Sequence, residues 1–227
     1  MELWSNSMSG RIGKTDQSDQ TDPNDKSEKV YQEILNGCCL PETIINKYME
    51  MITKLSPKLY AFNTNFFTAF SYYGYSRIHR WTKNVDIFSK ERLFIPIYFR
   101  SNRMWSLINV NFQDQSIRYY DSVGSGYRGG IRYQKVILKF LKLEYLMRKR
   151  KFFCTTRWKY INVNSLHHGF KFWDSGLFVC LAAHHFARNA SEDAKLTFTS
   201  KSVGGQENVK KKLILQLKSG SLNTLKI

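Results

Sequence analysis

A polar segment that leads into a long apolar run constrains this chain more than any other feature. Residues 177–183 read Leu-Phe-Val-Cys-Leu-Ala-Ala, and Asp174-Ser175-Gly176 comes directly before them. The run is long enough for a buried helix, which places Ser175 at or near the helix N-terminus. Unpaired backbone N–H groups and the positive end of the helix dipole lie there. The position therefore suits either a nucleophile or a simple N-cap at Asp174 or Ser175.

Residues 104–122 predict a β-hairpin upstream of this helix. The segment 104–112 is followed by a polar turn, Gln113-Asp114-Gln115-Ser116, and then by residues 117–122. Two strand-like segments separated by a short polar turn are typical of a hairpin. We expect Asp121 at the end of its second strand.

Taken in order, these segments resemble the SUMO-specific (sentrin-specific) cysteine proteases of the ubiquitin-like-protein protease family. That family has His-Trp on one strand, Tyr-x-Asp-Ser at the end of the next, and Gln-x-Asn-Gly-x-Asp-Cys-Gly-x-Phe opening a central helix. The matching segments here are Met104-Trp105, Tyr119-Tyr120-Asp121-Ser122 and Asp174-Ser175-Gly176-Leu177-Phe178. The resemblance runs from about Val30 to about Leu217. It implies an α+β, papain-like cysteine protease fold with a mixed central sheet flanked by helices.

The chain departs from this family at the residues that carry the chemistry. By the resemblance, Met104 stands at the catalytic histidine, Ser175 at the nucleophilic cysteine and Gly169 at the oxyanion glutamine, while Asp121 is kept. A thioether has no proton chemistry near neutral pH, and a serine hydroxyl without an adjacent base is a poor nucleophile. The family is a cysteine-type, deSUMOylating peptidase family, but we expect this member to be catalytically inactive.

The resemblance also implies a binding site for SUMO or a related ubiquitin-like protein. Two tryptophans of the family form a tunnel around the Gly-Gly tail of the modifier. Trp105 keeps one wall of that tunnel, whereas Cys39 replaces the other. We therefore expect modifier binding with a weaker hold on the tail.

The residues leave other functions open. One alternative is an active SUMO isopeptidase, in which His167 or His168 turns inward to activate Ser175 while Asp121 orients the imidazole. Another is a nucleic-acid-binding module, because the net charge is +17 and the first 30 residues hold four basic and six acidic side chains. The remaining chain thus carries +19, which favours acidic partners such as nucleic acid. A decayed gene copy without a retained role is a further alternative.

The spacing of the cysteines bears on cofactor binding, and the apolar runs bear on where in the cell the protein is found. The four cysteines have no metal-ligand spacing, so no metal or other cofactor is expected. Residues 1–10 lack the apolar core of a signal peptide, and no apolar run reaches membrane-spanning length. A nuclear or cytoplasmic protein is expected. The segment Arg148-Lys149-Arg150-Lys151 is either an import signal or anion patch, or an ordinary cationic helix end.

Composition predicts three regions: a disordered polar tail at 1–29, the protease-like domain at 30–218 and a frayed tail at 219–227. Periodicity predicts helices over residues 41–52, 131–147 and 208–217, and a short helix after Val30 that closes at Gly37. Strands are expected at 92–99, 105–112, 117–120 and 157–163. Four glycines within 124–130 predict a flexible loop. The oligomeric state stays open.

Overall fold

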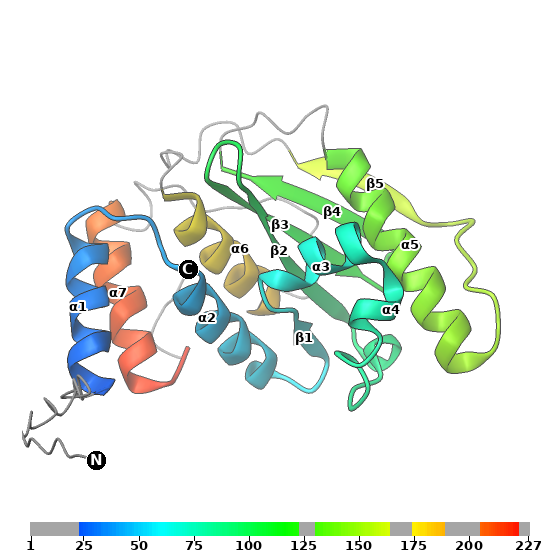
Figure 1. The fold of residues 1–227 in the computed structure, drawn as a ribbon, viewed down its shortest axis with the longest axis horizontal. Coiled ribbons are helices and arrows are strands. Elements are labelled where there is room, and N and C mark those ends of the chain that lie inside the picture. Colours follow the sequence, from blue (N-terminus) through cyan, green and yellow to red (C-terminus); the bar gives the residue numbers. More distant parts are fainter. Residues whose placement is uncertain (1–22, 123–129, 164–173, 189–204, 223–227) are drawn as a thin grey trace, which may run out of the picture.

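A five-stranded sheet forms the centre of the computed structural model, which describes residues 23–122, 130–163, 174–188 and 205–222. The strands lie in the order β1-β2-β3-β4-β5. They are β1 (Leu59–Ala61), β2 (Arg92–Phe99), β3 (Met104–Asn111), β4 (Ser116–Asp121) and β5 (Lys159–Val163). The two outer pairs are parallel and the two inner pairs antiparallel, so the sheet is mixed, as the sequence predicts (Figure 1).

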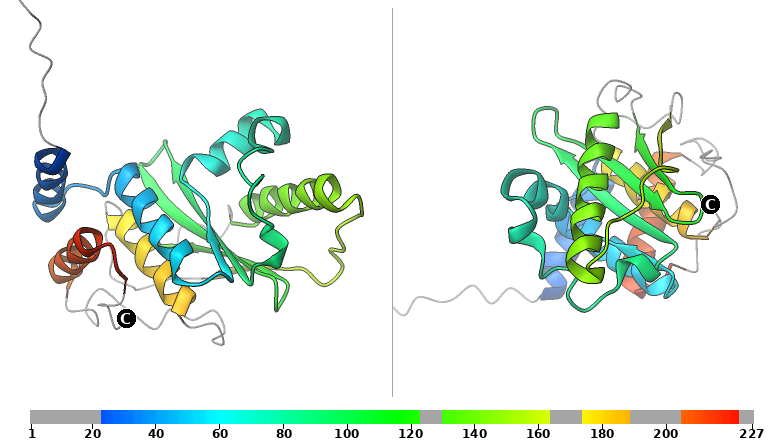
Figure 2. Two further views of the ribbon diagram at one scale, coloured as in Figure 1. Left: turned by 90° about the horizontal axis from the view of Figure 1, so that it is seen from below. Right: turned by 90° about the vertical axis from the view of Figure 1, so that its right-hand side faces the viewer.

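Helices cover both faces of this sheet (Figures 1 and 2). On one face lie α2 (Glu42–Leu55) and α6 (Ser175–Arg188), with α1 (Pro23–Leu35) and α7 (Gln206–Ser219) packed together beside them. The other face carries α3 (Asn65–Tyr73), α4 (Tyr75–Ile78), the 3-10 turn η1 (Ile87–Ser89) and α5 (Gly130–Lys149). The predicted α+β class is confirmed. Within the described ranges, no helix is both long and apolar enough to cross a membrane.

Alternation along the central strands divides the core into two layers. In β2, Phe94 packs in the α6 layer, whereas Leu93 and Ile95 pack in the α5 layer. β3 repeats the pattern with Leu107 and Ile108. Successive strand residues point to opposite faces, so a near-continuous apolar strand must be covered on both sides. Arg92–Phe99 is such a strand, and it lies inside the sheet between β1 and β3.

The apolar patterns of α2 and α6 explain how these two helices pack. α2 begins after Pro41 and buries one face, formed by Ile44, Ile45, Tyr48, Met49, Met51 and Ile52. Every residue from Ser175 to Phe186 in α6 is buried. A helix that is apolar all round has no solvent face, so it lies at the centre of a domain. α6 does so by packing mainly on β3 and α2.

Two predicted boundaries are wrong at the ends of the domain. α1 begins at Pro23, within the region expected to be a disordered tail, because the buried Tyr31 and Ile34 dock the helix near α7 and a proline fits its first turn. At the other end, residues 219–222 are ordered rather than frayed. Gly220 ends α7 with a positive φ of 66°, and Leu222 then returns to the core. Residues 1–22 and 223–227 lie outside the described part.

The predicted flexible loop over residues 124–130 is wrong at its last position. Gly130 is the first residue of α5, and a Cβ there would clash with Asn162 of β5 and with Tyr119 of β4. The glycine thus allows α5 to start close to the sheet. The rest of the predicted loop lies outside the described residues.

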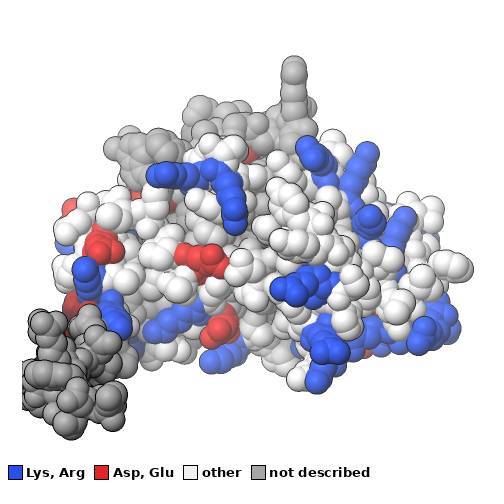
Figure 3. Space-filling model, in the orientation of Figure 1, with Lys and Arg blue, Asp and Glu red and all other residues white. Residues whose placement is uncertain are grey.

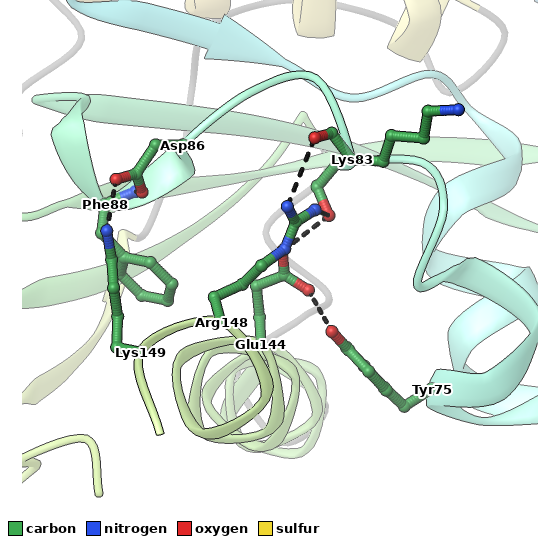
Figure 4. Close-up of polar contacts among 8 residues, drawn as sticks. Tyr75, Lys83, Asp86, Phe88, Glu144, Arg148 and Lys149 are labelled. Carbon is green, nitrogen blue, oxygen red and sulfur yellow. Dashed lines mark hydrogen bonds and ion pairs between the residues drawn. The ribbon is translucent and has the colours of Figure 1, made fainter. Parts of the chain in front are cut away.

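A buried carboxylate ties α5 to α4 and to the turn after α4 (Figure 4). Glu144 accepts hydrogen bonds from Tyr75 Oη at 2.6 Å and Thr82 Oγ1 at 2.7 Å, and Arg148 Nε lies 3.0 Å away. Arg148 also donates to the backbone oxygen of Lys83. A buried charge is tolerated when it is paired and hydrogen-bonded, and Glu144 meets both conditions.

Candidate active site

The start of α6 is bound to β3 through the serine that the sequence singles out. Ser175 is 1% exposed, and its Oγ accepts a hydrogen bond from the backbone N–H of Trp105 at 3.0 Å. The residues come together because the apolar run of α6, residues 177–183, packs on the central strand. The hydroxyl oxygen is therefore held at the beginning of β3.

Gly176 brings the two predicted tail-binding positions to the same place. A Cβ at Gly176 would lie 3.1 Å from Leu40 Cβ, 3.2 Å from Ile45 Cδ1 and 3.3 Å from Trp105 Cδ1. Leu40 directly follows Cys39, which is exposed. Trp105 is buried, and its indole lies beside the same glycine. Trp105 and the residue that follows Cys39 therefore both lie at the N-terminus of α6.

Strand register places Met104 and Asp121 on one face of the sheet. Ser106 in β3 pairs directly with Asp121 in β4. Met104 lies two residues before Ser106, so the two share a face, and Met104 and Asp121 are diagonal neighbours, roughly 7–8 Å apart at Cα. Both side chains are buried. Met104 opens β3, where Ser175 binds the backbone of Trp105, and Asp121 ends the neighbouring antiparallel strand, so the three positions lie at the same end of the sheet. Gly169 lies outside the described residues.

No described histidine lies near this cluster. His184 and His185 follow Ser175 by nine and ten residues along α6, a rise of roughly 14 Å. His79 is exposed at the end of α4, on the other side of the sheet. His167 and His168, on which the alternative of an active enzyme depends, lie outside the described residues. Within the described ranges, Ser175 therefore has no imidazole beside it to act as a base.

The cysteines do not supply a substitute nucleophile in the core. Cys180 is buried one and a half turns into α6, and burial raises the pKa of its thiol. A thiol held in its neutral form is unreactive. Among the described residues, no three histidine, cysteine, aspartate or glutamate side chains converge to form a possible metal site.

Comparison with known proteins identifies the family to which the chain belongs. The Ulp1 protease family, C-terminal catalytic domain, matches residues 39–217. The chain belongs to the Ulp1 protease family. It is 27% identical over 175 residues to sentrin-specific protease 2 of Mus musculus, covering 74% of this chain and 28% of that protein. It is 38% identical over 112 residues to sentrin-specific protease 3 of the same species, covering 49% and 19%. The chain thus matches less than a third of the length of these relatives.

Solved structures agree on the Ulp1 fold. The C-terminal Ulp1 protease domain, solved in complex with Smt3, the yeast orthologue of SUMO, is 22% identical to this chain with a TM-score of 0.68. The match covers 84% of this chain and 81% of that one. The predicted family and the papain-like fold are therefore confirmed.

A buried ion pair next to the site was not foreseen from the sequence. Asp174, the residue before Ser175, lies 2.9 Å from the ammonium of Lys210 in α7, and both side chains are buried. Neither Asp174 oxygen has a well-oriented hydrogen bond among the described residues, so the ammonium provides its compensating charge. Tyr98 was also missed; its ring packs 4.7 Å from that of Trp105. The ion pair fixes the start of α6, which carries Ser175, to α7. The ring contact joins β2 to β3, which carries Met104.

His184 has a structural role that makes stability depend on pH. Its Nδ1 is 3.1 Å from Tyr48 Oη, which in turn donates to Gln216 Oε1, so the network joins α6, α2 and α7. Burial, and then the charges of Arg188 and His185, lower the pKa of His184 from 6.5 to about 4. The folded state therefore favours the neutral ring, and the unfolded chain binds more protons between these two values.

We expect the free energy of unfolding to fall as pH drops from about 6.5 toward 4. Moving a histidine pKa from 6.5 to about 4 corresponds to about 3 kcal/mol, fully present above pH 6.5. Urea unfolding at several pH values should show this loss in the parent and a smaller one in His184→Asn. His79→Asn, at an exposed ring, serves as the control. Equal pH dependence in the parent and His184→Asn would contradict the role of this histidine.

Proposed function

We propose that this Ulp1-family domain has lost peptidase activity and binds SUMO or a related ubiquitin-like modifier. The observation that carries the proposal is the Ser175–Trp105 hydrogen bond beside Met104. By the family resemblance, this serine and this thioether stand at the positions of a thiol and an imidazole, which supports the loss of activity. The scaffold of the site is kept, while the groups that move protons and attack the carbonyl are absent.

The size of the catalytic deficit supports inactivity. Members of a catalytic triad act as a unit, and removing one forfeits most of an acceleration of about a millionfold. By the family resemblance, this chain lacks both the nucleophilic thiol and its base. Binding energy and backbone donors alone leave only weak background catalysis.

Retention of Trp105, one of the two tail-binding positions, supports modifier binding. Its ring packs on Tyr98 and lies beside Gly176, which suits the tunnel wall expected from the resemblance. Several relatives are named sentrin-specific proteases, and a fold neighbour was solved in complex with the yeast orthologue of SUMO. The exposed Cys39 leaves the other wall open, which predicts a modest affinity.

The test combines binding and cleavage on the same protein. We expect the parent to bind SUMO with a Kd below about 100 µM and to leave a fluorogenic SUMO conjugate intact. Cys39→Trp, which rebuilds the missing wall, should tighten binding about tenfold without producing cleavage. Cys38→Trp is the matched control, because Cys38 is also exposed and lies one residue away.

Two results would contradict the proposal in separate ways. Cleavage by the parent that disappears in Ser175→Ala would show an active serine enzyme. No binding by the parent or by Cys39→Trp, to SUMO or to other ubiquitin-like proteins, would remove the modifier from the proposal. The latter result would favour the alternatives that the sequence leaves open, a nucleic-acid-binding module or a decayed gene copy.

A further inference from the structure

The outer surface of α5 carries a row of cations on the far side of the sheet from Ser175. Arg132, Lys135, Lys139 and Lys142 are all exposed, and their spacing of three and four residues places them on one helix face. We call these four residues the α5 stripe. The opposite face of α5, which includes Ile137, Phe140 and Leu141, is buried in the core. The right-hand view of Figure 2 looks onto this helix.

The α5 stripe is not neutralised within the part of the chain that the structure describes. None of its four cations takes part in an ion pair there. The only acidic residue in α5 is Glu144, which is buried and already engaged by Arg148. Among the described residues, the stripe is therefore uncompensated positive charge.

The cationic segment 148–151, whose sequence suits an anion patch, is partly used by the fold (Figure 4). Arg148 bonds to Glu144 and to the Lys83 backbone, and Lys149 Nζ lies 2.6 Å from Asp86. The cations available to an outside partner thus lie mainly one to four turns earlier in α5.

Neighbouring elements extend the positive surface. Residues 130–159 contain ten lysines and arginines and one acidic residue, so this segment has almost no counter-charge of its own. Arg77, Arg80 and Lys83, on α4 and the turn after it, are exposed as well. Figure 3 shows lysine and arginine gathered over the α4 and α5 half, whereas acidic residues lie mostly over the other half.

We propose that the α5 stripe binds the phosphate backbone of a nucleic acid. From Arg132 to Lys142 the stripe is roughly 15 Å long, which matches the span of about four or five phosphates of one duplex strand. Lysine and arginine contacts to phosphates bind without reading sequence, so non-specific binding is expected. This site is independent of the proposed modifier site, because the two lie on opposite faces of the sheet.

The composition of the surface favours nucleic acid over protein or lipid. The centre of a protein interface is apolar and depleted in lysine, whereas the α5 stripe holds three lysines and one arginine. Helices that bind in the lipid interface insert a free apolar face, but that of α5 is buried in the core. Phe152, 89% exposed just after segment 148–151, offers a ring on which a base can stack.

The test measures binding of a fluorescent 20-base-pair DNA duplex, and of one of its single strands, across a range of salt. The full chain should bind with an affinity that falls steeply as salt rises. Replacing Arg132, Lys135, Lys139 and Lys142 by Gln should weaken binding at least tenfold at low salt. It should also lower the slope of log affinity against log salt by about 3 to 4. Circular dichroism and thermal melting would check that the variant is folded.

A matched control variant distinguishes a binding site on α5 from an effect of the overall positive charge. Lys26, Lys29, Lys47 and Lys54 are exposed on α1 and α2, and replacing all four by Gln removes the same charge from the other half. We expect this control to keep most of the affinity, and SUMO binding to be the same in both variants. Equal losses in the two variants, no binding of either DNA by the parent, or binding only to phosphatidylserine vesicles would overturn the proposal.

Discussion

A Met104→His/Ser175→Cys double variant is expected to cleave a SUMO conjugate that the parent chain leaves intact. The reason is the geometry at the end of β3. Residue 175 already contacts the backbone of Trp105, the neighbour of Met104, and Met104 lies diagonal to Asp121 on one face of the sheet. An imidazole at position 104 would thus have a carboxylate within reach, as the family resemblance requires.

The new thiol would also lie in a favourable place. Position 175 is the first residue of α6, where the helix dipole lowers the pKa of a thiol. Histidine is similar in size to methionine, so the substitution at the buried Met104 leaves little void. We expect the double variant to exceed the parent by at least about a thousandfold in rate.

Single variants provide the internal control for this gain. Because nucleophile and base act as a unit, Met104→His alone and Ser175→Cys alone should each fall far short of the double variant. Adding Gly169→Gln, which restores the oxyanion donor expected from the family resemblance, should raise the rate by about a further hundredfold. A folded double variant that binds SUMO but cleaves nothing would mean that the carboxylate and nucleophile positions have also drifted.

Much of the fold followed from local patterns in the sequence. β2 has the predicted bounds, Arg92–Phe99. A near-continuous apolar run of this length is typical of a strand that is covered on both faces. The three-and-four spacing of α2 marked its buried face correctly. Such features depend on residues that are close together in the sequence, so the local pattern of apolar residues is enough to predict them.

Features that depend on contacts between distant segments were not predictable in this way. β3 starts one residue earlier than predicted because Met104 pairs with Phe99 across the hairpin. α1 starts at Pro23 because it docks against α7, some 180 residues away in the chain. In the candidate site, the order of motifs located Met104, Asp121 and Ser175, but it carried no sign of the Asp174–Lys210 pair.

The reason for that omission is that Lys210, Lys211 and Lys212 are alike in the sequence. Only the rotation of α7 against α6 decides which of them is buried, and that rotation is set by the packing of Val209 and Leu213. Lys210 is 7% exposed and faces Asp174, whereas Lys211 is exposed and pairs with Glu207 on the surface. The same run of lysines therefore supplies both a buried ion-pair partner and its control.

Lys210→Met is expected to lower the free energy of unfolding by about 3–5 kcal/mol, because it leaves the Asp174 carboxylate buried without its counter-charge. Urea unfolding, followed by circular dichroism, measures the change. Lys211→Met, on the same helix, removes the same charge from an exposed pair and should move the midpoint little. The double variant Asp174→Asn/Lys210→Met, which removes both charges, should recover much of the loss.

This prediction also concerns the proposed binding site, because Asp174 is covalently joined to Ser175 at the start of α6. If the ion pair fixes that end of the helix, Lys210→Met should weaken SUMO binding even at temperatures where the variant is folded, and the double variant should restore part of it. Equal midpoints for Lys210→Met and Lys211→Met would show that the buried pair does not hold α7 to α6. The position of the Ser175 hydroxyl would then depend on its bond to Trp105 and on the packing of Gly176 alone.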